Sequence, residues 1–149
     1  MVVTEVIEVP RSPAESFAYV ADFTTVAEWD PGIHASQKVS GDGGIGTVYD
    51  VQADFRGKVV PFTYTVTAFD RDRRIVLNGV GEKATSLDTV MFEPAGDGGT
   101  RITYTADFRL KGALRLVEPF LGRTFTTLAQ RALAGLEARL GVASGSLGS

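Results

Sequence analysis

Alternation of apolar and polar residues dominates the first three quarters of the chain. Residues 2–9 alternate and are rich in β-branched side chains, which predicts a first strand. Six more segments of this kind follow, at residues 33–40, 47–55, 59–69, 74–80, 85–93 and 100–110. Short turns join them, many rich in glycine and aspartate, and such turns favour antiparallel pairing of consecutive strands. The pattern predicts seven strands in an antiparallel meander.

Two short helices are predicted between the first two strands. Ser12 is placed to cap a helix that has Pro13 at its first position, and Glu15 completes a capping box. Apolar residues then recur at a spacing of three and four. A second helix is predicted at residues 23–29, ended by the Asp-Pro-Gly sequence at residues 30–32.

The spacing of apolar residues changes at residues 113–140, where they recur at helical intervals and form one apolar stripe. The stripe consists of Leu114, Val117, Leu121, Phe125, Leu128, Ala132 and Leu136. Pro119 and Gly122 are expected to kink or divide this helix near its start, and Gly141 is a natural C-cap. The opposite face carries few basic residues, so the stripe is predicted to pack in the core rather than on a membrane. Residues 142–149 are predicted to form a flexible tail after a single domain at residues 1–141.

This order of elements predicts an α+β fold in which one long C-terminal helix covers a curved seven-stranded sheet. One helix is too narrow to fill the concave side of such a sheet. Because an empty cavity costs stability, a retained one argues for a small hydrophobic ligand. The inward positions of the strands and helix give the predicted binding residues: Tyr49, Val51, Phe55, Phe62, Tyr64, Val66, Ile102, Tyr104, Phe108, Val117, Leu121, Phe125 and Leu128.

Charge and composition narrow the function classes. The net charge of −3 is spread along the chain and leaves no basic stripe for phosphates, so no nucleic-acid partner is predicted. The chain has no cysteine and one histidine, which disfavours a metal site, and no cofactor is predicted. No signal peptide or apolar run of membrane-spanning length is evident, which favours a cytoplasmic protein. The expected assembly is a monomer or weak homodimer.

Three stretches of the sequence resemble a known family. They are VIEVPRSPAESFAYVADFTTVAEWDPGI from residue 6, GGTRITYTADFRLKG at residues 98–112, and the helix strings FLGRTF and AGLEARL. The chain resembles the START-like helix-grip (SRPBCC) superfamily, in its polyketide cyclase/dehydrase and lipid-transport-like branch. The resemblance implies a hydrophobic small-molecule pocket, with Trp29 at its edge. In cyclases of this fold, tyrosine hydroxyls and an arginine are thought to orient carbonyl groups.

Few side chains could carry chemistry in such a pocket. Asp88 shares a strand phase with apolar residues, so it is the one carboxylate proposed for the pocket, with Tyr64 and Tyr104 as hydroxyl donors. The competing interpretation pairs Asp88 with an arginine across neighbouring strands. Asp54 and Asp107 are predicted to face away from the pocket.

Other polar side chains give less support to catalysis. Arg101 and Arg109 fall in the outward phase, which weakens the cyclase interpretation and leaves binding intact. His34 is interpreted as a surface or hydrogen-bonded residue.

Three functions therefore remain open. The leading one is a carrier or sensor of a small apolar ligand such as a lipid or an aromatic polyketide. The second is a cyclase or dehydratase that uses pocket tyrosine and aspartate groups. The third is a protein-interaction or stress module, for which a wide exposed apolar patch and no pocket are expected.

Overall fold

The computed structural model describes residues 1–141, so the predicted tail lies outside the described residues. It confirms seven antiparallel strands in one sheet, in the order β1-β7-β6-β5-β4-β3-β2. All consecutive strands from β2 to β7 pair with each other, and β1 pairs with β7. The strands are β1 (Val2–Val9), β2 (Ile33–Ser40), β3 (Val48–Phe55), β4 (Lys58–Asp70), β5 (Arg74–Gly81), β6 (Ala84–Ala95) and β7 (Gly99–Leu110).

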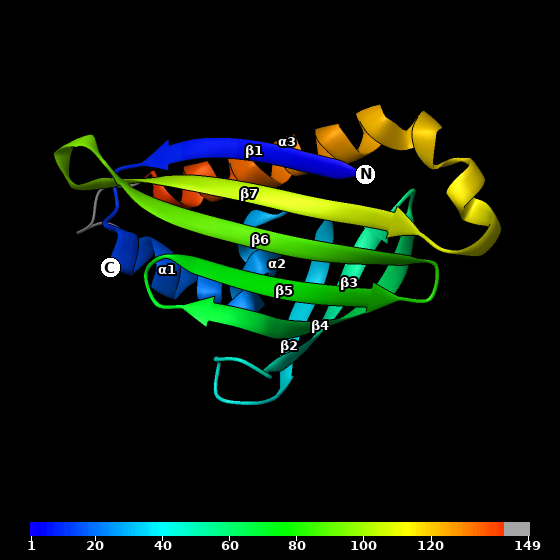
Figure 1. Cartoon of the computed structure of the whole chain (residues 1–149), viewed down its shortest axis with the longest axis horizontal. Coiled ribbons are helices and arrows are strands. Elements are labelled where there is room, and N and C mark those ends of the chain that lie inside the picture. The colour runs from blue at the N-terminus through cyan, green and yellow to red at the C-terminus, as the bar shows by residue number, and fades with distance from the viewer. Residues whose placement is uncertain (142–149) are drawn as a thin grey trace.

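The helices lie together on one face of the curved sheet (Figure 1). The α-helices are α1 (Pro13–Ala21), α2 (Val26–Trp29) and α3 (Gly122–Leu140). The 3₁₀ turn η1 (Phe23–Thr25) lies between α1 and α2, and η3 (Gly112–Leu116) and η4 (Glu118–Leu121) precede α3. A further 3₁₀ turn, η2 (Gly96–Gly98), joins β6 to β7. The helix-grip fold predicted from the sequence is confirmed.

The capping box predicted at the start of α1 is present. The Ser12 side chain accepts a hydrogen bond from the Glu15 backbone amide at 3.1 Å, and its hydroxyl donates to the Glu15 carboxylate. Pro13 occupies the first turn, where no amide proton is needed. Local residues therefore determine where the chain leaves β1 and turns beneath the sheet.

The long C-terminal helix is shorter than the periodicity predicts. Residues 112–121 form the 3₁₀ turns η3 and η4, and the regular helix begins only at Gly122. Pro119 has no amide hydrogen and disfavours a continuous helix through this point. Val117 is consequently 43% exposed instead of packing in the apolar stripe.

A bulge in β4 changes the predicted phase of that strand. The pairing of β4 with β5 shifts register between Val66 and Ala68. Phe69 then lies on the core face, and its ring packs edge-to-face on Phe17 at a centroid distance of 5.1 Å. The bulge bends the strand and re-aims the side chains that follow it.

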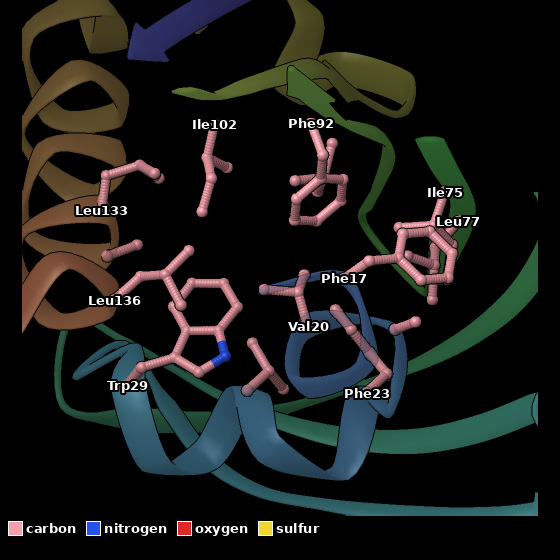
Figure 2. Packing of buried hydrophobic residues seen from close by; sticks show 14 of the residues in the cluster. Phe17, Val20, Phe23, Trp29, Ile75, Leu77, Phe92, Ile102, Leu133 and Leu136 are labelled. Atoms are coloured by element: carbon pink, nitrogen blue, oxygen red, sulfur yellow. The ribbon is translucent and has the colours of Figure 1, made fainter. Parts of the chain in front are cut away.

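The core has two parts along α3. The larger one packs α1, α2 and the C-terminal half of α3 on the sheet through Phe17, Trp29, Leu133 and their neighbours (Figure 2). The smaller one gathers Val3, Phe125 and Ala129 near the N-terminal half of α3. The candidate site lies where the two parts meet the middle of the sheet.

Candidate functional site

A largely apolar cavity of about 230 Å³ lies between the sheet, α2 and α3. Most of the predicted aromatic binding residues line it. Those on its wall are Trp29, Phe55, Phe62, Tyr64, Tyr104, Phe108 and Phe125, together with Leu128. The carrier hypothesis required that the aromatic residues not fill the interior completely, and the cavity meets that requirement.

Four predicted lining residues are instead part of the solid core. Tyr49, Val51, Val66 and Ile102 are buried and do not border the cavity. The segment that follows β1 in the chain, α1 to α2, packs over the sheet here, and the Phe23 ring of η1 meets the Tyr49 ring of β3 edge-to-face at 5.7 Å. The inward phase of these residues was right, and their predicted place on the wall was wrong.

Two more predicted lining residues lie off the wall because η3 and η4 replace the start of the helix. Val117 is exposed, and Leu121 packs at the edge of the smaller core part. Neither borders the cavity. Asp54, predicted to face away, borders the cavity at an exposed position, whereas Asp107 does not border it.

Asp88 is the polar centre of the cavity wall. It is 4% exposed and accepts hydrogen bonds from two hydroxyl groups. The Ser86 hydroxyl donates to Oδ1, and the Tyr104 hydroxyl donates to Oδ2 at 2.9 Å. No arginine or lysine among residues 1–141 forms an ion pair with it, so the competing interpretation of a cross-strand arginine partner is wrong.

The sheet register brings these groups together. Tyr64, Gly79 and Ser86 stand side by side on β4, β5 and β6. Because Gly79 has no side chain, the Tyr64 ring can lie across β5 in the direction of Ser86. Tyr104 is the diagonal neighbour of Asp88, whose direct partner on β7 is Ala106.

Asp30 is a second carboxylate on the cavity wall, although the sequence pattern predicts it only as part of a turn. Its Oδ1 accepts a hydrogen bond from the Gly32 amide at 2.8 Å, which fixes the side chain. The Asp-Pro-Gly sequence directly after Trp29 was the available signal. An aspartate that caps its own turn is held in one orientation.

Burial changes the acidity of this cluster. Loss of solvation raises the pKa of Asp88 from 3.8 to about 6, although the Ser86 and Tyr104 hydroxyls act in the opposite direction. Loss of solvation also raises the pKa of Asp30 to about 6, opposed by the Gly32 amide and assisted by the charge of Asp88. Burial raises the pKa of Tyr64 and Tyr104 well above 10, with the Asp88 charge adding to it.

The tyrosine hydroxyls therefore stay protonated at neutral pH and act as hydrogen-bond donors. Asp88 can exchange a proton near neutral pH, as a general acid or base requires. Among residues 1–141, no arginine and one lysine border the cavity, and that lysine, Lys83, is exposed. The arrangement can hold a polar group of an otherwise apolar molecule.

The remaining candidates do not join this cluster. The His34 side chain is 65% exposed and lies 4.0 Å from the Asp54 carboxylate. Among residues 1–141, no three histidine, aspartate or glutamate side chains gather into a metal site. No helix in this part of the chain is long and apolar enough to cross a membrane. A protein-interaction module was expected to have no pocket, whereas residues 1–141 enclose the cavity described above.

Trp29 lies on the wall where α2 meets α3. It is buried, and its indole Nε1 has no hydrogen-bond partner among the described residues. Gly135 of α3 touches the Trp29 backbone so closely that a side chain there would collide with the Trp29 carbonyl oxygen. The contact fixes the distance between α2 and α3 beside the cavity.

Comparison with protein families gives one match over nearly the whole chain. The family described as polyketide cyclase / dehydrase and lipid transport matches residues 1–141. Comparison with curated protein sequences gives no match.

Solved structures with the same fold come from several bacteria. TTHA0849 from Thermus thermophilus is similar with a TM-score of 0.81 and 20% identity, covering 94% of this chain and 97% of that one. The Zhui aromatase/cyclase from Streptomyces sp. R1128 has a TM-score of 0.81 and 14% identity, covering 94% and 93%. A START superfamily protein from Mycobacterium smegmatis has a TM-score of 0.76 and 19% identity, covering 93% and 96%. At these identities the likeness establishes the fold alone.

Proposed function

The chain belongs to the polyketide cyclase / dehydrase and lipid transport family, and from this premise we propose that it binds a small, mostly apolar molecule in the cavity between sheet and α3. The observation that carries the proposal is an apolar wall interrupted by one polar cluster around Asp88. The ligand places its apolar body against the aromatic side chains. Its hydroxyl or carbonyl group meets the Tyr64 and Tyr104 hydroxyls and the Asp88 carboxyl.

The size of the cavity limits the ligand. An apolar cavity of roughly 150 Å³ accommodates benzene, and this one measures about 230 Å³. A compound with one or two rings fits without rearrangement of the wall. An empty apolar cavity costs roughly 24 cal/mol per Å³, so occupation by such a ligand stabilises the fold.

The first test uses the only tryptophan of the chain, Trp29, which lies on the wall. Naphthalene and 2-naphthol are titrated while Trp29 fluorescence is followed, with calorimetry as a second measurement. Both are expected to bind, and 2-naphthol more tightly by up to about tenfold because its hydroxyl can hydrogen-bond to the polar cluster. Failure of both compounds to bind would overturn the proposal.

A matched pair of variants places the binding in the cavity. Ala106→Leu fills space on the wall beside Asp88 and is expected to abolish binding. Ala134→Leu adds the same atoms at an exposed position of α3 and is expected to leave binding unchanged. Native mass spectrometry of protein purified from its own host then identifies the retained molecule.

Catalysis is the second candidate, and the geometry of Asp88 favours it. A buried carboxyl group with a pKa of about 6 beside the Tyr104 hydroxyl suits proton transfer next to a polarised carbonyl. In this interpretation Asp88 removes or returns the proton, and the Tyr64 hydroxyl donates to the carbonyl oxygen of a polyketide-like substrate. The Tyr104 hydroxyl, which donates to Asp88, holds the carboxyl group in place.

Asp88→Asn separates the two candidates. The variant is expected to keep its affinity for the retained molecule and to lose turnover of it by at least about a hundredfold. Tyr104→Phe removes one donor and is expected to lower turnover less. Unchanged turnover in Asp88→Asn would rule out this catalytic role and leave the binding proposal standing.

A further inference from the structure

An exposed apolar segment connects β7 to α3, close to the cavity. We call residues 111–123 the docking segment; they span η3, η4 and the first residues of α3. Leu116 is 79% exposed and Phe120 is 84% exposed, with Leu114 and Val117 also at the surface. Figure 1 shows this part of the chain, in yellow to orange, extending beyond the end of the sheet. Clustered apolar side chains at such exposure mark an interaction surface.

The charges around these side chains identify the kind of partner. The docking segment contains three basic residues, Lys111, Arg115 and Arg123, in a chain whose net charge is −3. No acidic side chain among residues 1–141 forms an ion pair with Arg115 or Arg123. Glu118, the one acidic residue of the segment, lies 3.2 Å from the N-terminal amine of Met1. The segment is therefore locally cationic.

The segment also meets the cavity. Leu114 borders the cavity and belongs to η3. Lys83, another residue of the cavity wall, accepts a hydrogen bond from the Lys111 amide through its carbonyl oxygen at 2.9 Å. A ligand that leaves or enters on this side of the cavity passes directly beside the docking segment.

We propose that the docking segment binds the surface of an anionic lipid bilayer. Leu116 and Phe120 enter the interface, and Arg115 and Arg123 contact the lipid headgroups, whereas the Lys111 ammonium group donates to the Gly81 carbonyl oxygen at 2.7 Å. Apolar side chains flanked by cations combine hydrophobic burial with electrostatic attraction at such a surface. The binding is peripheral and reversible, since the segment is short. It brings the cavity against the bilayer, where apolar molecules dissolve.

The full chain is tested by co-sedimentation with vesicles of phosphatidylcholine alone and of phosphatidylcholine mixed with phosphatidylglycerol. The protein is expected to bind the mixed vesicles more tightly by at least about tenfold, and added salt is expected to weaken that binding. Arg115→Gln is expected to weaken it by about fivefold. Equal binding to both vesicle types, or no binding, would overturn the proposal.

Variants then assign the binding to this surface. Leu116→Ser/Phe120→Ser is expected to abolish sedimentation with the mixed vesicles. Val39→Ser/Ile45→Ser removes two exposed apolar side chains from β2 and the turn after it, and is expected to have no effect. If both double variants sediment like the natural sequence, the docking segment is not the membrane surface.

Two controls separate membrane docking from ligand binding and from dimer formation. Leu116→Ser/Phe120→Ser is expected to bind 2-naphthol like the natural sequence, so loss of docking is distinguishable from loss of the ligand site. Light scattering without vesicles is expected to give the same molecular mass for this double variant and for the natural sequence. A dimer that the double variant loses would assign the segment to a second copy of the chain and overturn the membrane proposal.

Discussion

The ring of Tyr64 lies across Gly79 on the adjacent strand, so close that a Cβ at position 79 would stand 2.5 Å from Tyr64 Cζ. The same relationship recurs two residues further along β5, where a Cβ at Gly81 would stand 2.8 Å from a ring carbon of Phe62. Both rings line the cavity. The two glycines of β5 therefore give the aromatic wall its shape.

Gly79→Ala is expected to destabilise the fold by about 1–3 kcal/mol, because the new methyl group forces the Tyr64 ring from its place. Urea denaturation of a double-mutant cycle checks the cause. In a Tyr64→Ala background the same substitution is expected to cost much less. An equal cost in both backgrounds would show that the ring is not the obstacle. Asn78→Ala, at an exposed position on β5, controls for changes in strand propensity.

The fold was predictable because periodicity and turn signals agree along most of the chain. The alternation in Val2–Val9 predicts the strand and Ser12 predicts the helix cap, and the structure confirms both, since each depends on neighbouring residues alone. The bulge after Val66 was not predictable, because it reverses the phase of β4 without a local sequence signal. A register shift depends on the partner strand, which periodicity does not describe.

The site was predictable only as far as the alternation of side chains along each strand determines it. This alternation predicts that Asp88 and Tyr104 lie on the inner face of the sheet, and in the structure a hydrogen bond connects the two side chains. Phase could not separate Val51, which α2 and its neighbours cover, from Phe55, which borders the cavity on the same strand. Asp30 lies outside any strand, so its position on the cavity wall depends on how α2 packs against the sheet.

Gly135→Ala is expected to destabilise the protein even though alanine favours helix by about 1 kcal/mol over glycine. A Cβ at this position would stand 1.8 Å from the Trp29 carbonyl oxygen, so α2 and α3 would have to move apart. Thermal unfolding measures the effect, and a red shift of Trp29 fluorescence reports the separation. Ala134→Gly, at an exposed position of α3, is the control and is expected to cost about 1 kcal/mol. A stabilised Gly135→Ala variant would contradict the close contact.

Ser12→Ala is expected to lower the free energy of unfolding by about 1 kcal/mol, because the Glu15 amide loses its acceptor. Urea denaturation measures this change. Ser12→Asp keeps an acceptor at the N-cap and is expected to retain most of the stability. If alanine and aspartate have the same effect at position 12, the cap does not stabilise α1.

The raised pKa values of Asp88 and Asp30 predict that the free energy of unfolding falls as the pH rises. The pKa of Asp88 in the fold is about 6, against 3.8 for an ordinary aspartate, so between these values the folded state holds a proton that the unfolded state releases. Stability from this group is present at low pH and lost as the pH rises through about 6. Between about pH 5 and pH 7.5 the loss is about 1.4 kcal/mol, and Asp30 acts in the same direction.

Asp88→Asn cannot ionise, so its free energy of unfolding is expected to fall about 1.4 kcal/mol less than that of the natural sequence over this pH range. Urea denaturation at both pH values measures the difference. Asn can still accept a hydrogen bond from one of the two hydroxyls that now meet the carboxylate, which limits the structural disturbance. Asp50→Asn, at an exposed position on β3, is the matched control for the loss of one negative charge. An Asp88→Asn variant whose stability falls with pH as steeply as that of the natural sequence would mean that Asp88 is charged in the fold at pH 5.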